Sequence, residues 1–427
     1  MNTTGFKRKY MKVLVLGGGI IGVSSAWFLN KAGYDVTVIE RQNGCAQETS
    51  FANGCQISVS HAEPWANPSA PMKILKWLGQ EDAPLLFKLK PDLLQWRWGL
   101  QFLKECTKKR TDDNIRQIVS LCEYSRLTLG EIRQQTPFDY DCLTKGILHF
   151  YTDEKEFQNS LSAAALMRDL GCNRQSISKK QVLEIEPALK SVADSIVGGD
   201  FTQTDESGDI YKFTKHLAQE CEKKGVKFLY NTTVTKILQE NKTINAVEII
   251  NNCGQYQKID VDKVIVCMGS YSQPLLKDLG INLLVYPGKG YSATYDIINS
   301  DIAPEVSITD DEYKIVLTRI GNRLRVAGTC ELNGFDRQLN AVRCQALTKR
   351  AKHLFPNVCN FDNPTYWSGL RPLTPSNVPY IGQSKQYLGL YINTGHGTLG
   401  WTMGAGSGRA IAEIVQGKKP DVNFKFI

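Results

Sequence analysis

The sequence predicts an α/β protein in which a Rossmann-like domain is joined to a second domain with a mixed-sheet α+β fold. Three observations support this prediction. The chain has 427 residues, more than one compact core accommodates. It begins with a strand, a glycine-rich turn, a helix and a second strand. Helical and strand patterns then interleave along the chain, with a strand-rich region in its middle.

The first unit has the pattern of a β-α-β motif. Residues 12–16 form an apolar run of strand length, and residues 17–22 read Gly-Gly-Gly-Ile-Ile-Gly. A helical stretch follows to about Lys31, Gly33 ends it, and residues 35–40 form a second buried strand. Residues 41–71 are rich in Ser, Asn, Gly and Pro, which predicts a loop.

Periodicity predicts the remaining elements. We expect helices over 72–137, 154–170, 179–186, 210–224 and 337–354, and a last helix that ends at residue 416. We expect strands over 146–151, 226–229, 234–238, 245–250, 264–266 and 389–392. Residues 283–330 also alternate in the manner of strands, as at 313–317 and 323–327. The expected nucleotide-binding domain is discontinuous and comprises residues 11–71, 179–282 and 364–427. The expected substrate domain comprises 72–178 and 283–363, and residues 1–10 are expected to be a disordered extension.

The glycine-rich turn has the features of a phosphate-binding loop. Gly17 permits a tight turn, Gly19 lets the backbone approach a pyrophosphate, and Gly22 lets the helix lie close to the strand. The pyrophosphate then meets free N–H groups at the positive end of the helix, where Ile20 and Ile21 lie. With a strand before it and a helix after it, this motif predicts a bound dinucleotide.

Glu40 ends the second strand at the spacing expected for a carboxylate that binds a ribose hydroxyl, and Arg41 follows as a further candidate contact. Because a carboxylate repels a 2′-phosphate, NADP is disfavoured. Residues 395–400 repeat the glycine spacing, but no further strand or acid follows them. We expect this turn to set a helix N-terminus against the flavin edge that becomes negative on reduction; a structural turn is the alternative. A flavoprotein that also binds NAD would carry a second nucleotide-binding unit in mid-chain, and none is visible here. The sequence therefore predicts one bound FAD and no nicotinamide cofactor.

Composition narrows the remaining classes. The formal net charge is +8, which alone does not choose between nucleic acid, anionic lipid and an acidic substrate. Twelve cysteines occur without a C-x-x-C pair, and with five histidines no metal-ligand spacing emerges. We therefore expect no metal and reduced thiols. No apolar stretch is long enough for a membrane helix, so we expect a cytoplasmic protein.

Residues 70–110 contain nine Lys or Arg, four acids and three tryptophans, Trp77, Trp96 and Trp98. A basic, tryptophan-bearing helical stretch can dock on the anionic inner face of the cell membrane, and such docking suits electron transfer to a quinone. Helices that roof a substrate pocket and turn a solvated face outward are the alternative. Nucleic-acid binding is a weaker option, because no recognised DNA or RNA module is present.

Four separated segments carry a resemblance to a known family. They are residues 48–54 with Gln56, residues 287–292 (PGKGYS), residues 367–375 (WSGLRPLTP) and residues 393–403 (NTGHGTLGWTM). With these segments the chain resembles the D-amino acid dehydrogenases, within the FAD-dependent amino acid oxidases and glycine oxidases, from Met11 to about Gly417. One departure is visible: the family usually has Asn-Ala-Gly where this chain has Asn53-Gly54-Cys55, which leaves open whether a thiol touches the flavin.

The resemblance implies an FAD-binding domain that holds FAD in an extended form beneath a mixed-sheet substrate domain. It places Thr49, Ser50, Asn53 and Gly54 along the ribityl chain and ring. It places Val234 by the adenine, and Met268 and Gly269 close to the cofactor. The pyrimidine edge is expected to meet Gly397, Thr398, Leu399 and Gly400.

The implied reaction is oxidation of the amine carbon of a small D-amino acid to a 2-oxo acid and ammonia, with electrons passed to a quinone or other acceptor. A zwitterionic substrate is best held by its carboxylate, and arginine does so bidentately. Arg371 is the expected clamp and Arg325 its rival. Tyr291 is a candidate hydrogen-bonding partner of the substrate, and Lys289 a candidate neighbour of flavin N5. His396 is expected to contact the cofactor or backbone rather than to act as a base.

The sequence is also compatible with two other functions. An oxidase of glycine, sarcosine or a D-amino acid would use oxygen directly. A non-catalytic or RNA-acting flavoprotein of the same fold would not oxidise amino acids at all.

Overall fold

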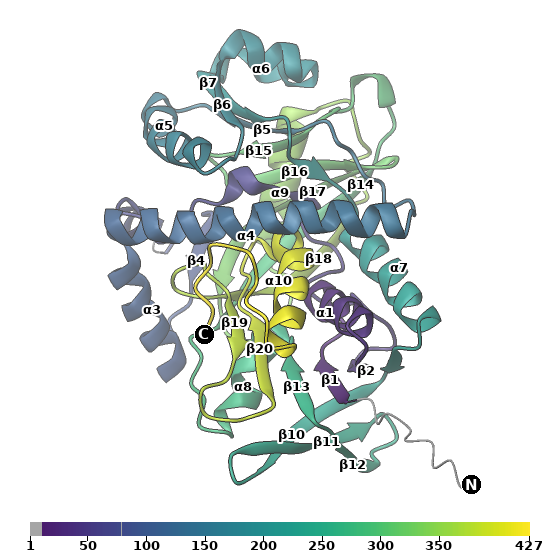
Figure 1. Cartoon of the computed structure of the whole chain (residues 1–427). Helices are drawn as coiled ribbons and strands as arrows, with labels where there is room; N and C mark the ends of the chain where they lie inside the picture. Colours follow the sequence, from purple (N-terminus) through teal and green to yellow (C-terminus); the bar gives the residue numbers. More distant parts are fainter. Residues whose placement is uncertain (1–10, 78) are drawn as a thin grey trace, which may run out of the picture.

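The computed structural model describes residues 11–77 and 79–427, so the extension expected over residues 1–10 lies outside the described residues. Figure 1 shows a large sheet with α5 and α6 in its upper half and a second sheet with α1 and α10 in its lower half. The long helix α4, Lys108–Gln135, runs across the view between them. The chain therefore folds around two sheets, as the α/β prediction requires.

The lower sheet has six strands in the order β19-β20-β13-β1-β2-β9, all parallel except β19. Their bounds are Lys12–Leu16 (β1), Asp35–Ile39 (β2), Lys227–Leu229 (β9), Lys263–Val266 (β13), Tyr380–Gln383 (β19) and Leu390–Thr394 (β20). The central strands are apolar along their length because both faces are covered. The carboxyl end of β1 therefore delivers the glycine turn to the edge where nucleotides bind in such sheets.

Helix α1, Ile20–Lys31, packs against α10, Gly400–Val415, and against α7, Ile210–Lys223. The contact between α1 and α10 depends on glycine. A Cβ at Gly408 would lie 2.6 Å from the carbonyl carbon of Ser24. The two glycine-rich turns, which lie far apart in the sequence, are thereby brought to neighbouring helix starts.

The upper sheet has nine strands, in the order β18-β14-β17-β16-β15-β5-β7-β6 with β4 beside β17. Their bounds are Leu85–Phe87 (β4), Ile147–Tyr151 (β5), Arg174–Ser178 (β6), Gly198–Thr202 (β7), Tyr286–Asp296 (β14), Ser307–Asp310 (β15), Ile315–Ile320 (β16), Arg323–Leu332 (β17) and Thr365–Leu373 (β18). The helical elements packed on it are Glu154–Asp169 (α5), Lys179–Ile185 (α6), Pro187–Ser195 (η2) and Ala341–Leu354 (α9).

The remaining elements are small. A three-stranded sheet comprises Thr232–Glu240 (β10), Thr243–Asn251 (β11) and Tyr256–Asp260 (β12), and Gln56–Ile57 (β3) pairs with Glu206–Ser207 (β8). The short helices are Val59–His61 (η1), Ala70–Trp77 (α2), Leu93–Glu105 (α3), Gly269–Tyr271 (η3), Ser272–Lys277 (α8) and Ser300–Ile302 (η4). No helix within the described ranges is long and apolar enough to cross a bilayer.

Several expected elements differ in the structure. The helix expected over 337–354 begins at Ala341, because the Asn340 side chain caps it by accepting the Val342 N–H at 3.0 Å. The helical region expected over 72–137 is interrupted by β4. Strands β6, β7, β12, β18 and β19 were not expected. Strand β18 was not expected because it contains Pro372, and a proline argues against a strand in the interior of a sheet. The proline is tolerated because β18 lies at the sheet edge.

The sheets divide the chain differently from the expected domains. Residues 179–202, expected in the FAD-binding domain, contribute α6, η2 and β7 to the nine-stranded sheet side, and β18 also belongs to that sheet. Helix α4, expected in the substrate domain, packs against α10. Periodicity locates an element but not the sheet that it joins. We propose that the domain boundaries follow the two sheets.

Candidate active site

Two adjoining cavities mark the candidate site. One has a volume of about 460 Å³ and the other about 760 Å³. Four residues line both of them: Thr49, Asn53, Arg371 and Thr398. These residues come from the loop after β2, from β18 and from the turn before α10, so tertiary folding alone brings them together. A ligand in the smaller cavity and one in the larger cavity would meet here.

The smaller cavity begins at the N-terminus of α1. Gly17, Gly19, Ile20 and Ile21 line it, and Gly19 precedes the helix without any side-chain cap. The Ile20 N–H reaches Ser50 Oγ at 3.2 Å. An uncapped first turn leaves N–H groups for a phosphate, which is the property that the glycine motif predicts.

Glu40 faces this turn. Its two carboxylate oxygens accept the N–H of Gly18 at 2.7 Å and the N–H of Gln42 at 2.8 Å. Burial raises the pKa of Glu40 against the effect of these two hydrogen bonds. The carboxylate thus lies beside the glycine turn, where a ribose hydroxyl would compete for the same oxygens.

Most residues expected to hold the cofactor line the smaller cavity. They are Gly17, Gly19, Ile20, Ile21, Glu40, Arg41, Thr49, Ser50, Asn53, Val234, Met268, Gly269, Gly397, Thr398 and Gly400. Gly54 and Leu399 line the larger cavity instead. Gly22 lines neither: a Cβ there would overlap the carbonyl oxygen of Gly17, so its role is close packing of α1 on β1.

His396 supplies a further test of the cofactor fit. Its side chain is 3% exposed and lines the smaller cavity, and Nε2 has no hydrogen-bond partner among the described residues. Burial lowers the pKa of His396 to about 3, so the ring is neutral at pH 7. An unpaired buried polar atom costs about 1–3 kcal/mol, which a ligand atom could recover. A cavity that runs from the α1 turn to His396 fits FAD.

Sequence reasoning missed Tyr271, Thr233 and Gln47, which also line the smaller cavity. The Arg41 guanidinium lies 3.7 Å from the centre of the Tyr271 ring, and it donates to Glu48 through Nε at 2.6 Å. Gln47 lies on a loop, Thr233 on β10 and Tyr271 at the end of η3, and no motif spacing connects them to the glycine turn.

Arg371, on β18, lies at the junction of the cavities. Its Nη1 donates to the carbonyl oxygen of Thr329 at 2.7 Å. Gly290 on the neighbouring strand makes room for it, because a Cβ there would overlap the guanidinium. Burial lowers the pKa of Arg371, and no carboxylate of the described residues lies near enough to oppose this effect. A half-buried cation with no carboxylate beside it among the described residues is suited to an anionic ligand.

Thr329 holds this arginine through an irregular strand. Its φ is +53°, a left-handed value that β-branched residues rarely adopt. Thr329 and Cys330 of β17 together lie opposite the single residue Gly290 of β14, which is a β-bulge. Thr329 also lines the larger cavity. Bulges of this kind are common beside binding sites because they redirect individual groups.

Tyr291 lies at the larger cavity, whereas Lys289, expected near the flavin, lies away from both cavities. Tyr291 lines the larger cavity, but its hydroxyl donates to buried Glu331. Lys289 lines neither cavity and is neither solvated nor free: its Nζ donates to Asp336 at 2.8 Å and lies 3.2 Å from Glu331. Burial opposes the charged form of Glu331, yet the Tyr291 hydroxyl and the Lys289 charge hold its pKa below the ordinary value. Lys289 therefore belongs to a buried ion-pair network.

Arg325, the rival clamp, lies behind the cavity wall. It donates through Nε to Thr294 Oγ1 at 3.1 Å and through Nη1 to Cys55 Sγ at 3.6 Å, and it lines neither cavity. Cys55 itself lines the larger cavity but not the smaller one. Burial raises the pKa of the Cys55 thiol to about 11, against the charge of Arg325, so the thiol is protonated at neutral pH. The position of Cys55 therefore favours a contact with a ligand in the larger cavity over a contact with the cofactor in the smaller one.

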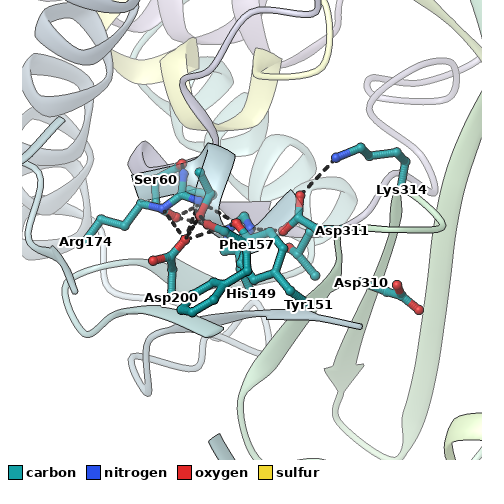
Figure 2. Close-up of polar contacts among 12 residues, drawn as sticks. Ser60, His149, Tyr151, Phe157, Arg174, Asp200, Asp310, Asp311 and Lys314 are labelled. Carbon is teal, nitrogen blue, oxygen red and sulfur yellow. Dashed lines mark hydrogen bonds and ion pairs between the residues drawn. The ribbon is translucent and has the colours of Figure 1, made fainter. Parts of the chain in front are cut away.

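One wall of the larger cavity is a polar network that sequence reasoning missed (Figure 2). His149 on β5 lies 2.7 Å through Nδ1 from Asp311 and 3.3 Å through Nε2 from Ser60 Oγ. Asp311 also accepts from Lys314 at 3.1 Å, and Arg174 donates to the Ser60 carbonyl at 2.8 Å. These residues come from four separate stretches, so their spacing in the sequence gives no signal.

Another wall is apolar. It is formed by α2, β4, α3 and the loop before α2. Its residues include Trp65, Ile74, Trp77, Phe87, Trp98 and Phe102. Trp98 anchors α3 to the site, because its indole N–H donates to the Leu373 carbonyl at 2.8 Å, two residues beyond Arg371.

Comparisons with known proteins identify relatives that align with nearly the whole chain. A D-amino acid dehydrogenase of Dechloromonas aromatica is 51% identical over 417 residues, covering 98% of this chain and 100% of that protein. Another, of Paramagnetospirillum magneticum, is 45% identical and covers 97% of each. The solved L-proline dehydrogenase of P. horikoshii has a TM-score of 0.75 at 19% identity, with 97% of this chain and 95% of that chain covered. Residues 12–414 match the model of one family, and the chain therefore belongs to the FAD dependent oxidoreductase (DAO) family.

Proposed function

We propose that this protein is a D-amino acid dehydrogenase, which oxidises small D-amino acids such as D-alanine to 2-oxo acids and ammonia. The observation that carries the proposal is the position of Arg371: its half-buried guanidinium lies at the junction of the two cavities and has no carboxylate partner among the described residues. The relatives named D-amino acid dehydrogenase, at 40–51% identity, support the choice of substrate class.

The residues on this site bind and orient the substrate. The substrate carboxylate pairs with Arg371, whose own position is fixed by the Thr329 carbonyl. FAD, when bound, supplies a two-electron acceptor for the hydride of the substrate Cα. Loss of this hydride and of a proton from the ammonium group leaves an imine, which water hydrolyses to the 2-oxo acid and ammonia. Orientation at the junction of the cavities accounts for much of the rate, since correct positioning lowers a barrier by several kcal/mol.

An anaerobic reduction screen tests this function. The yellow purified protein should bleach with D-alanine and stay yellow with L-alanine at the same concentration. Rapid peroxide release when air is admitted would identify an oxygen-using oxidase instead. No bleaching with any D-amino acid, together with tight and salt-sensitive RNA binding, would support the RNA-acting alternative.

We also propose that the protein docks on an anionic membrane surface and passes electrons to a quinone. Helix α3 presents four apolar side chains to the outside, Leu93, Trp96, Leu100 and Leu103, each more than half exposed. Their spacing of three or four residues places them along one stripe. The surrounding stretch carries an excess of Lys and Arg, and this combination favours the interface of an anionic bilayer.

Vesicle co-sedimentation tests the docking. The holoenzyme should bind vesicles that contain anionic phosphatidylglycerol and should bind neutral phosphatidylcholine vesicles less. Leu93→Asp places a negative charge on the stripe, so we expect roughly tenfold weaker partitioning. Leu127→Asp is the matched control, because Leu127 is also more than half exposed but lies on α4. Equal loss in both variants would contradict a specific role for α3.

A further inference from the structure

The mouth of the larger cavity lies on the exposed stripe of α3. Trp96, Leu100 and Leu103 are exposed to the outside, and the same three residues line the cavity. Leu93, at the start of the helix, is exposed but does not line it. The surface proposed to contact lipid is therefore continuous with the cavity interior.

An apolar wall leads from this mouth to the junction of the cavities. Ile74, Trp77, Phe87 and Phe102 line it, and Trp98 forms its inner part. Trp98 is bonded to β18 close to Arg371, and Arg371 lines both cavities. The polar network of His149 and its partners lines a different part of the same cavity.

A small zwitterion gains nothing from so long an apolar wall, because its charged groups are satisfied by Arg371 and by polar side chains. An uncharged molecule with an alkyl or isoprenoid tail gains stabilisation in proportion to the area that it buries. The lining therefore favours a second ligand that is apolar and arrives from the membrane.

We propose that this α2–α3 wall is the binding site of a lipid-soluble quinone, which enters from the bilayer and reaches the same junction that the substrate occupies. The inference rests on the proposed function. The overall reaction balances: the amino acid, the quinone and water give the 2-oxo acid, ammonium and the quinol. One C–H and one N–H bond of the substrate break, and two O–H bonds of the quinol form.

Gly99 offers a way to block this site. It lies within α3 and lines the cavity, and a Cβ there would meet nothing within 4 Å. Gly99→Phe therefore adds bulk to the quinone site with little strain. Gly130 is the matched control, since it lies in the interior of α4, also has open space, and lines neither large cavity.

The test uses the oxidised holoenzyme and a decyl-substituted benzoquinone. Quinones quench nearby indoles, and Trp65, Trp77, Trp96 and Trp98 all line the cavity. We expect saturable tryptophan quenching in the unmodified protein, at least tenfold weaker affinity in Gly99→Phe, and unchanged affinity in Gly130→Phe. Ile74→Gln, which makes the wall polar without filling it, should also weaken the quenching.

Anaerobic reduction by D-alanine and reoxidation by water-soluble phenazine methosulfate are measured in parallel. In each variant, flavin reduction by D-alanine shows whether the substrate still reaches Arg371, and quinone affinity is compared among the variants in which it does. Equal quinone affinity in Gly99→Phe, Ile74→Gln and the unmodified protein would overturn the proposal. Failure of D-alanine to reduce the unmodified protein would instead overturn the proposed function, whatever the quenching shows.

Discussion

At the scale of single residues, charge balance separates the two candidate arginines. Arg371 lines both cavities and donates to the Thr329 carbonyl, whereas Arg325 donates to Thr294 and Cys55 and lines neither cavity. The motif segment predicted Arg371 as the clamp, and its position supports that assignment without testing it. The sequence could not show that the Arg325 side chain lies behind the cavity wall, because the direction of a side chain from a strand depends on the neighbours of that strand.

Arg371→Met should raise KM for D-alanine by roughly tenfold to a hundredfold, because a charged hydrogen-bonding partner of the carboxylate is lost. Bound flavin should be retained, as measured by its absorbance. Arg325→Met should change KM by less than about threefold while lowering the unfolding temperature, since it leaves buried partners unsatisfied. A larger KM effect in Arg325→Met than in Arg371→Met would exchange the two roles.

At the scale of elements, the sequence predicted the role of the first glycine-rich turn more firmly than that of the second. The first turn precedes α1 as expected, and the second precedes α10, whose start lines the smaller cavity through Gly400. Their proximity depends on close packing of α1 against α10. No spacing within either motif encodes this contact.

Gly408→Ala tests the packing of these helices. The new methyl group would press on the Ser24 backbone, so we expect a loss of about 1–3 kcal/mol in the free energy of unfolding, measured by urea denaturation of the holoenzyme. Gly130→Ala has open space on α4 and should instead stabilise the protein by about 0.5–1 kcal/mol. Stabilisation by both changes would show that the α1–α10 contact relaxes easily.

At the scale of the whole molecule, the polar network of Figure 2 joins η1, which carries Ser60, to the nine-stranded sheet. Burial opposes the charged form of Asp311, but the charges of Lys314 and His149 hold its pKa well below the ordinary value. A carboxyl group with a lowered pKa stabilises the fold above its unfolded value of about 3.9, and this contribution is lost as the pH falls through the folded value.

Asp311→Asn should therefore lower the free energy of unfolding at pH 7 by roughly 2–4 kcal/mol, because Lys314 loses its counter-charge and His149 loses a hydrogen-bonded carboxylate. The difference from the unmodified protein should begin to narrow below about pH 4, where the Asp311 carboxyl of the unfolded chain takes up a proton, and should close only at the lower pH at which the folded protein takes it up too. Glu305→Gln is the control: its ion pair with Lys145 is exposed, so we expect a change within about 0.5 kcal/mol. A difference that stays constant from pH 3 to pH 7 would contradict the linkage.

The sequence by itself determined the α/β fold, the glycine turn with its following helix, and the family, because these depend on local patterns and on segments that stay contiguous. It also located Arg371 within a motif. Only the tertiary structure decided which sheet each strand joins and that Lys289 is held in an ion-pair network. It also decided that His149, Asp311 and Arg174 together line one wall of the larger cavity. Those outcomes depend on contacts between residues far apart in the chain, and periodicity carries no information about such contacts.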